Sequence, residues 1–146
     1  MRPAVTGGAV RPQLFALDAF ALMGMLLAEP AGPRVRTVLR VAERQGRPVL
    51  MSLINFGEVL YNVERRVGPR RTARMVSELR RTPIQVLPVT HARTFHAARL
   101  KVRHGLGYAD AFAAALASEF QATLLTGDDD FHVVDGLVDI EWLPSR

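Results

Sequence analysis

The feature that most constrains the fold of this chain is its alternation of short apolar runs with longer helical stretches. The short runs are typical of buried strands and lie at residues 14–17, 49–51, 84–87, 123–125 and 140–143. The longer stretches are typical of helices and lie at residues 19–28, 33–45, 53–67, 70–81, 91–104 and 108–120. Parallel strands need such crossover helices between them. We therefore predict an α/β fold, a three-layer domain with a central parallel sheet of about five strands flanked by helices.

The length of the chain, 146 residues, fits one domain. A chain of this size buries roughly 68–70% of its unfolded surface, so its core needs no disulfide or structural metal. The absence of cysteine excludes disulfides, thiolate metal sites and a cysteine nucleophile. Proline and glycine are frequent at the start, so we expect residues 1–12 to form a flexible tail and residues 13–146 to form the domain.

The stretch from 14 to 28 is apolar except for Asp18, and it follows two arginines in the way that a signal peptide's hydrophobic region does. The charge of Asp18 within the stretch argues against a signal peptide. We find no run that approaches the roughly 20 apolar residues of a membrane helix. We therefore expect a soluble, cytoplasmic protein with no membrane partner.

The charge of the chain is basic, at +5, and 18 of its 19 cationic residues are arginine. Arginine forms two parallel hydrogen bonds to phosphate or carboxylate, which suits a polyanion or an acidic protein. A GC-rich coding sequence also enriches arginine. Charge alone therefore leaves the partner open.

Four carboxylates occupy positions where an α/β sheet binds ligands, beyond the carboxyl ends of its strands. Asp18 follows the first predicted strand and Asp128 follows the fourth, while Asp110 begins the alanine-rich helix. Glu58 lies opposite the apolar stripe of its helix, on a polar face that includes Asn55. Each also has a structural interpretation: a helix cap, a turn residue, a complement to a helix dipole or a solvated face.

Together, these four carboxylates would repel one another unless a cation lay among them. Oxygen ligands favour a hard divalent ion such as Mg²⁺ or Mn²⁺. Two such ions activate a water and stabilise the leaving oxygen of a phosphodiester. The pattern therefore favours a nuclease, whose remaining positive charge would suit an RNA backbone.

Over about residues 14–143 the chain resembles the PIN-domain ribonucleases of the VapC type, the toxins of type II toxin–antitoxin systems. The segments that carry the resemblance are Leu17-Asp18, Ser52-Leu53 through Glu58-Val59, Tyr108-Ala109-Asp110-Ala111, and Leu125-Thr126-Gly127-Asp128 with Phe131.

The resemblance implies a Mg²⁺- or Mn²⁺-dependent endoribonuclease that leaves a 5′-phosphate and a 3′-hydroxyl. It also implies a homodimer and inhibition by a cognate antitoxin. The catalytic, metal-binding carboxylates that it implies are Asp18, Glu58, Asp110 and Asp128. Asp130 is expected to add a further metal contact, and Thr126 to support the acidic loop.

The chain departs from the family pattern directly after its first aspartate. Family members usually carry threonine or serine there, whereas this chain has Ala19 and Phe20. The run of three aspartates at 128–130 also leaves the loop ligand open, and we prefer Asp128 for its spacing from Thr126. The alternative function is a catalytically inactive PIN-like module that binds RNA or a protein.

Overall fold

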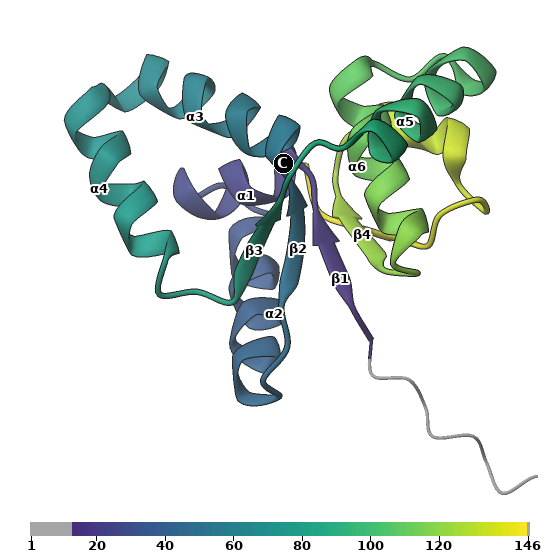
Figure 1. Cartoon of the computed structure of the whole chain (residues 1–146). Coiled ribbons are helices and arrows are strands. Elements are labelled where there is room, and N and C mark those ends of the chain that lie inside the picture. The colour runs from purple at the N-terminus through teal and green to yellow at the C-terminus, as the bar shows by residue number, and fades with distance from the viewer. Residues whose placement is uncertain (1–12, 146) are drawn as a thin grey trace, which may run out of the picture.

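The computed structural model of the chain describes residues 13–145. They form three layers, in which helices flank a central parallel sheet on both sides (Figure 1). This arrangement confirms the predicted fold class. The tail predicted at residues 1–12 lies outside the described residues.

Within residues 13–145 the sheet has five parallel strands, in the order β3-β2-β1-β4-β5. They are β1 (Phe15–Leu17), β2 (Val49–Ser52), β3 (Ile84–Leu87), β4 (Thr123–Thr126) and β5 (Ile140–Trp142). Every strand bound lies within one residue of its prediction. The chain begins at the centre of the sheet, adds β2 and β3 on one side, and then adds β4 and β5 on the other. The strand order therefore reverses between β1 and β4, and such a switch point is where open α/β sheets bind ligands.

The helices connect these strands, and several of them begin at a capping side chain. They are α1 (Ala19–Leu26), α2 (Gly32–Arg44), α3 (Leu53–Val67), α4 (Pro69–Leu79), α5 (His91–His104), α6 (Tyr108–Glu119) and the 3₁₀ helix η1 (Asp129–Val134). The side chains of Asp18, Ser52 and Thr90 accept backbone N–H bonds at the starts of α1, α3 and α5. None of the helices within residues 13–145 is long and apolar enough to cross a membrane.

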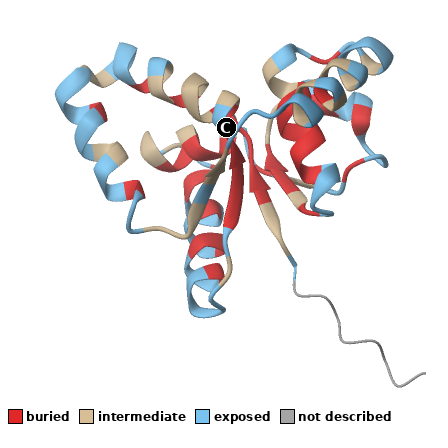
Figure 2. Cartoon of the chain, viewed as in Figure 1, coloured by how far each residue is buried: buried red, intermediate tan, exposed pale blue. Residues whose placement is uncertain are grey.

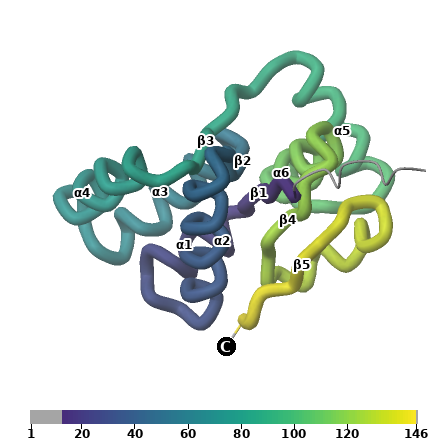
Figure 3. The backbone as a smooth tube through the Cα atoms, turned by 90° about the horizontal axis from the view of Figure 1, so that it is seen from below, coloured from purple at the N-terminus to yellow at the C-terminus, as the bar shows by residue number. Residues whose placement is uncertain are grey.

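Two apolar cores form because successive residues of a strand point to opposite faces of the sheet. One core packs α1, α2 and the buried sides of α3 and α4 against Leu17, Met51 and Leu125. The other packs α5, α6 and η1 against Ala16, Leu50 and Leu124. Figure 2 shows the burial of the central strands, and Figure 3 shows the two groups of helices on either side of them. Burial on both faces explains why the strands read as nearly continuous apolar runs.

The alanine-rich helix α6 is core, because residues 111–117 are all buried. It contacts α3, α5 and the strands β1, β2 and β4. The small side chains permit this close approach on several sides at once, as core packing requires. The packing places the first turn of α6, which carries Asp110, beside the start of α3.

Candidate functional site

Two aspartates lie at the switch point of the sheet. Asp18 directly follows β1, and Asp128 is the second residue after β4. Because β1 and β4 are neighbouring parallel strands, their carboxyl ends meet at one edge. The fold therefore brings together two residues that are 110 positions apart in the sequence.

Asp18 is held in a buried hydrogen-bond network. Only 2% of the residue is exposed, and its Oδ1 accepts the Ala21 N–H at 2.9 Å. The hydroxyl of Thr126 donates to Oδ2 of Asp18 and accepts the N–H of Asp128 at 3.0 Å. Thr126 thereby joins the two acidic loops, which is the contact that its predicted supporting role requires. Asp18 is also the N-cap of α1, so it has the structural role that the sequence had left open.

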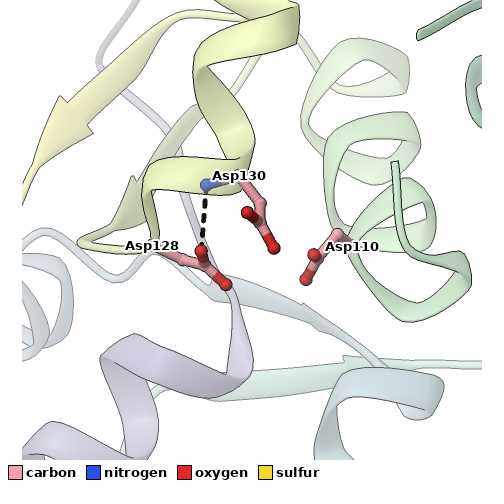
Figure 4. Close-up of side chains that lie close together, drawn as sticks. All are labelled: Asp110, Asp128 and Asp130. Carbon is pink, nitrogen blue, oxygen red and sulfur yellow. Dashed lines mark hydrogen bonds between the residues drawn. The ribbon is translucent and has the colours of Figure 1, made fainter. Parts of the chain in front are cut away.

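Asp128 also belongs to a second group of carboxylates, together with Asp110 of α6 and Asp130 of η1. One side-chain oxygen from each of Asp110, Asp128 and Asp130 lies within 4.8 Å of the others. Figure 4 shows these three side chains turned toward one another. Asp128 also caps η1, since its Oδ1 accepts the Asp130 N–H at 3.0 Å. Asp129 belongs to neither contact, and its side chain is 94% exposed.

Helix α3 brings Glu58 to the same edge of the sheet. Its position depends on Asn55, a residue of the polar helix face that the sequence could assign neither to solvent nor to the site. Asn55 is fully buried, and its Nδ2 donates to the backbone oxygen of Ala109 at 3.0 Å. Its Oδ1 is buried without a partner among the described residues. This bond ties α3 to the first turn of α6, so Asn55 positions Glu58 and Asp110 relative to each other. The signal in the sequence that could have identified Asn55 is its spacing of three residues from Glu58, which puts both on one side of the helix. Helical periodicity gives no reason to expect that Asn55 is buried.

Three of the acidic residues, Asp18, Glu58 and Asp110, have raised pKa values. Burial is the main cause for Asp110, whose pKa rises to about 6, with further contributions from the charges of Asp128, Glu58 and Asp130. Burial also raises the pKa of Asp18 to about 7, against hydrogen bonds from Thr126 and Ala21 that favour the charged form. The pKa of Glu58 is raised as well, through burial and through the charge of Asp128, while a hydrogen bond from Asn55 lowers it. All five acidic residues selected from the sequence therefore share one electrostatic site.

This donor set fits a hard divalent cation. It consists of carboxylate oxygens, the ligands that Mg²⁺ and Mn²⁺ prefer. Burial, and secondarily the neighbouring carboxylates, raise the pKa values of Asp18 and Asp110, and a bound cation would offset this cost of negative charge. Both oxygens of Asp18 accept protein hydrogen bonds, but a carboxylate has about four lone-pair positions and retains the capacity to bind a metal.

The departure from the family pattern at Phe20 has a structural explanation. Its ring packs against Gly127, where a Cβ atom would overlap the ring and lie 2.8 Å from the backbone oxygen of Leu143. An aromatic side chain here thus supports the loop before Asp128 by packing. Glycine at 127 is required because the ring and the neighbouring backbone leave no space for a side chain.

Comparison with known families supports this description of the fold. The model of the PIN domain family matches residues 16–137. The chain belongs to the PIN domain family, which confirms the resemblance found in the sequence. A search of curated proteins found no match.

Solved structures with this fold include several VapBC proteins. VapBC2 from Rickettsia felis, bound to a DNA fragment from its promoter, has a TM-score of 0.71 and 16% identity, over 90% of this chain and 100% of that one. VapC20 from Mycobacterium tuberculosis, a sarcin–ricin loop cleaving toxin, has a TM-score of 0.68 and 19% identity, over 89% and 99%. VapBC-5 from the same organism, of the VapBC family of toxin–antitoxin systems, has a TM-score of 0.58 and 19% identity, over 90% and 98%. At these identities the likeness concerns the fold.

Proposed function

We propose that this protein is a Mg²⁺- or Mn²⁺-dependent endoribonuclease, the toxin of a type II toxin–antitoxin pair. The observation that carries the proposal is the convergence of Asp18, Glu58, Asp110, Asp128 and Asp130 at the switch point of a PIN-family sheet. A purely structural role for each carboxylate does not account for this convergence. Like charges gathered at a ligand-binding edge are costly without a cation or a proton.

The residues divide into two groups by their contacts. Asp110, Asp128 and Asp130 present mutually close oxygens that would hold the cation. Asp18 is buried and its charge interacts with those of Asp110 and Asp128, while Glu58 adds a half-buried carboxylate from α3. Asp18 and Glu58 complete the proposed metal-binding set. Carboxylates from four different elements would thus hold the cation at a fixed position on a rigid sheet edge.

The chemistry that a divalent cation supplies here, when bound, is activation of a water and stabilisation of the leaving oxygen of a phosphodiester. The protein's own contribution is to fix the carboxylates by short contacts. Thr126 and Asn55 provide these contacts for the β1–β4 edge and for the α3–α6 junction.

A basic surface suited to a nucleic-acid backbone lies along the end of α3 and along α4. Its exposed arginines are Arg65, Arg66, Arg70, Arg71 and Arg74. Arg66 pairs with Glu29 at 3.2 Å, whereas the other four have no carboxylate partner among residues 13–145. Free guanidinium groups bind phosphates through paired hydrogen bonds. This surface supports a polyanionic substrate, and RNA is the polyanion that the proposed activity requires.

The proposal includes a cognate antitoxin, a homodimeric assembly and a cytoplasmic location. Structural neighbours described as VapBC support an antitoxin partner. Co-expression with the product of an adjacent small gene is expected to give a complex that co-purifies and does not cleave RNA. A free, harmless chain under the same conditions would contradict the toxin assignment.

The nuclease assignment is tested by cleavage of a mixed RNA pool with Mg²⁺, with Mn²⁺ and with EDTA. Asp110→Asn is expected to abolish cleavage, because it removes one charge from the cluster without changing its size. Asp129→Asn is the matched control, since that side chain is 94% exposed and outside the cluster. Equal cleavage by the two variants would refute the site. RNA binding without cleavage by the unmodified protein would favour the inactive binding module.

A further inference from the structure

An exposed tyrosine and an arginine lie on the same face of α3 as Glu58. Tyr61 follows Glu58 by three residues and Arg65 follows it by seven, so the three side chains lie within about 60° of one another around the helix axis. Tyr61 is about 4.5 Å from Glu58 along that axis, and Arg65 is about 10 Å from it. The ring and the guanidinium therefore extend from the carboxylate cluster along one line.

The two side chains are arranged as a pair. The guanidinium carbon of Arg65 lies 5.5 Å from the centre of the Tyr61 ring, in a cation–π contact. Tyr61 is 52% exposed, so much of the phenol remains in contact with water. Arg65 is exposed and has no carboxylate partner within residues 13–145. The pair thus presents an aromatic surface and an uncompensated charge together.

Other exposed aromatic residues lack this combination. Tyr108 packs edge-on against Phe112, with ring centres 5.1 Å apart. Phe120 has Arg93 over its ring at 5.8 Å, but Arg93 is bound to Glu119 at 3.0 Å. That pair also lies at the far end of α6 from Asp110. Of the two cation–π pairs among the described residues, only Tyr61–Arg65 combines a guanidinium that has no carboxylate partner with a ring one helical turn from a carboxylate of the proposed site.

The chemistry that matches this pair is an unpaired nucleotide. Bases in single-stranded RNA stack on aromatic side chains, which duplex bases cannot do because they are stacked on one another. Arginine beside the ring is suited to the phosphate of the same strand. A ring one turn from Glu58 would hold a base close to the bond that the cluster is proposed to cleave.

We propose that Tyr61 and Arg65 form a subsite for one unpaired nucleotide of the substrate, with its base stacked on the ring and its phosphate bound by the guanidinium. The inference rests on the proposed nuclease function and adds the preference for unpaired RNA at that position. It assigns Tyr61 a role in binding and selectivity rather than in bond cleavage.

The test is RNA binding in EDTA, where no metal-dependent cleavage takes place. The probe is a short single-stranded RNA that contains the fluorescent base 2-aminopurine, whose emission is quenched by stacking. Unmodified protein and Tyr61→Phe are expected to quench the probe with similar affinity. Tyr61→Leu is expected to bind it about 5- to 150-fold more weakly and without quenching. Phe120→Leu is the matched control, expected to bind as the unmodified protein does.

Arg65→Gln is a second, independent variant. It is expected to weaken binding and to reduce the slope of log affinity against log salt by about one. The same RNA annealed to its complement is expected to be insensitive to Tyr61→Leu. Circular dichroism and thermal unfolding show whether each variant is folded, and the half-exposed position of Tyr61 makes a folded variant the expected result.

The inference is overturned if Tyr61→Leu binds and quenches the probe as the unmodified protein does, or if it weakens duplex binding equally. It is also overturned if Tyr61→Leu prevents only the binding of a protein partner. If unmodified protein cleaves RNA while Tyr61→Leu binds it normally, the subsite fails and the nuclease function stands. If unmodified protein neither binds nor cleaves RNA, both proposals fail.

Discussion

Replacing Asp18 with asparagine is expected to change the pH dependence of stability in the metal-free protein. Asp18 is 2% exposed, and burial raises its pKa from 3.8 to about 7. Between these values the folded state binds more protons at this residue than the unfolded state does. Stability from this residue is therefore retained at low pH and lost as the pH rises through the window from about 4 to about 7.

The magnitude follows from the two pKa values of Asp18. They differ by about 3, and each pKa unit corresponds to about 1.36 kcal/mol, so the folded state loses about 4 kcal/mol across the window. An asparagine at position 18 carries no charge and keeps an oxygen to accept the Ala21 N–H. The unfolding free energy of the Asp18→Asn variant should therefore not show this loss. All other titrating residues are common to both proteins, so the difference between them reports on residue 18 alone.

The assay is urea unfolding in EDTA at intervals from pH 4 to pH 8.5. The difference in unfolding free energy between Asp18→Asn and the unmodified protein is expected to change in favour of the variant by about 4 kcal/mol as the pH rises. Addition of Mg²⁺ at pH 8 should then stabilise the unmodified protein more than it stabilises Asp18→Asn. At a Mg²⁺ concentration one hundred times its Kd, the stabilisation of the unmodified protein is about 2.7 kcal/mol. If the unfolding free energies of the two proteins change with pH in parallel in EDTA, the argument that ionisation of Asp18 destabilises the folded state is refuted.

The remaining predictions concern the loop that carries Asp128. Thr126→Val removes the hydroxyl that joins the two acidic loops and is expected to cost about 1.5–3 kcal/mol in urea unfolding and to lower RNA cleavage, whereas Thr126→Ser retains both. Gly127→Ala forces a Cβ into a ring and is expected to cost about 1–3 kcal/mol in thermal unfolding. Gly57→Ala is the matched control, because nothing lies within 4 Å of its Cβ and helix propensity favours it by about 0.5–1 kcal/mol. Equal effects of the two glycine substitutions would contradict the packing argument.

Strand positions and helix starts were predictable from the sequence because both depend on local patterns. In an α/β domain, a short apolar run that is buried on both faces fits the central parallel sheet. Ser52 and Thr90 occur where a side-chain oxygen caps a helix, and the structure places both in that role. Such signals need no knowledge of the partner element.

The helix η1 was not predicted, because it is too short for periodicity to show. Its apolar residues, Phe131 and Val134, are one 3₁₀ turn apart, and two positions do not define a pattern. This helix turns Asp129 outward and places Asp130 beside Asp128. The choice among three consecutive aspartates therefore depended on a local geometry that the sequence does not display.

The positions of Glu58 and Asn55 depend on how α3 crosses the edge of the sheet. Periodicity shows which residues of a helix share a face, but it does not show what that face meets. Here the polar face that includes Asn55 meets the first turn of α6, and Asn55 is buried by that contact. Long-range packing of this kind decides whether an acidic helix face is solvated or borders a site.

The central claim is that the carboxylate cluster holds a divalent cation, and Mn²⁺ binding measured by titration calorimetry tests it most directly. The unmodified protein and Asp129→Asn are expected to bind Mn²⁺ with equal affinity and stoichiometry, because Asp129 is outside the cluster. Asp110→Asn is expected to lose the binding, since it removes one of three converging carboxylates. Equal binding of Mn²⁺ by all three proteins, or by none of them, would contradict the account.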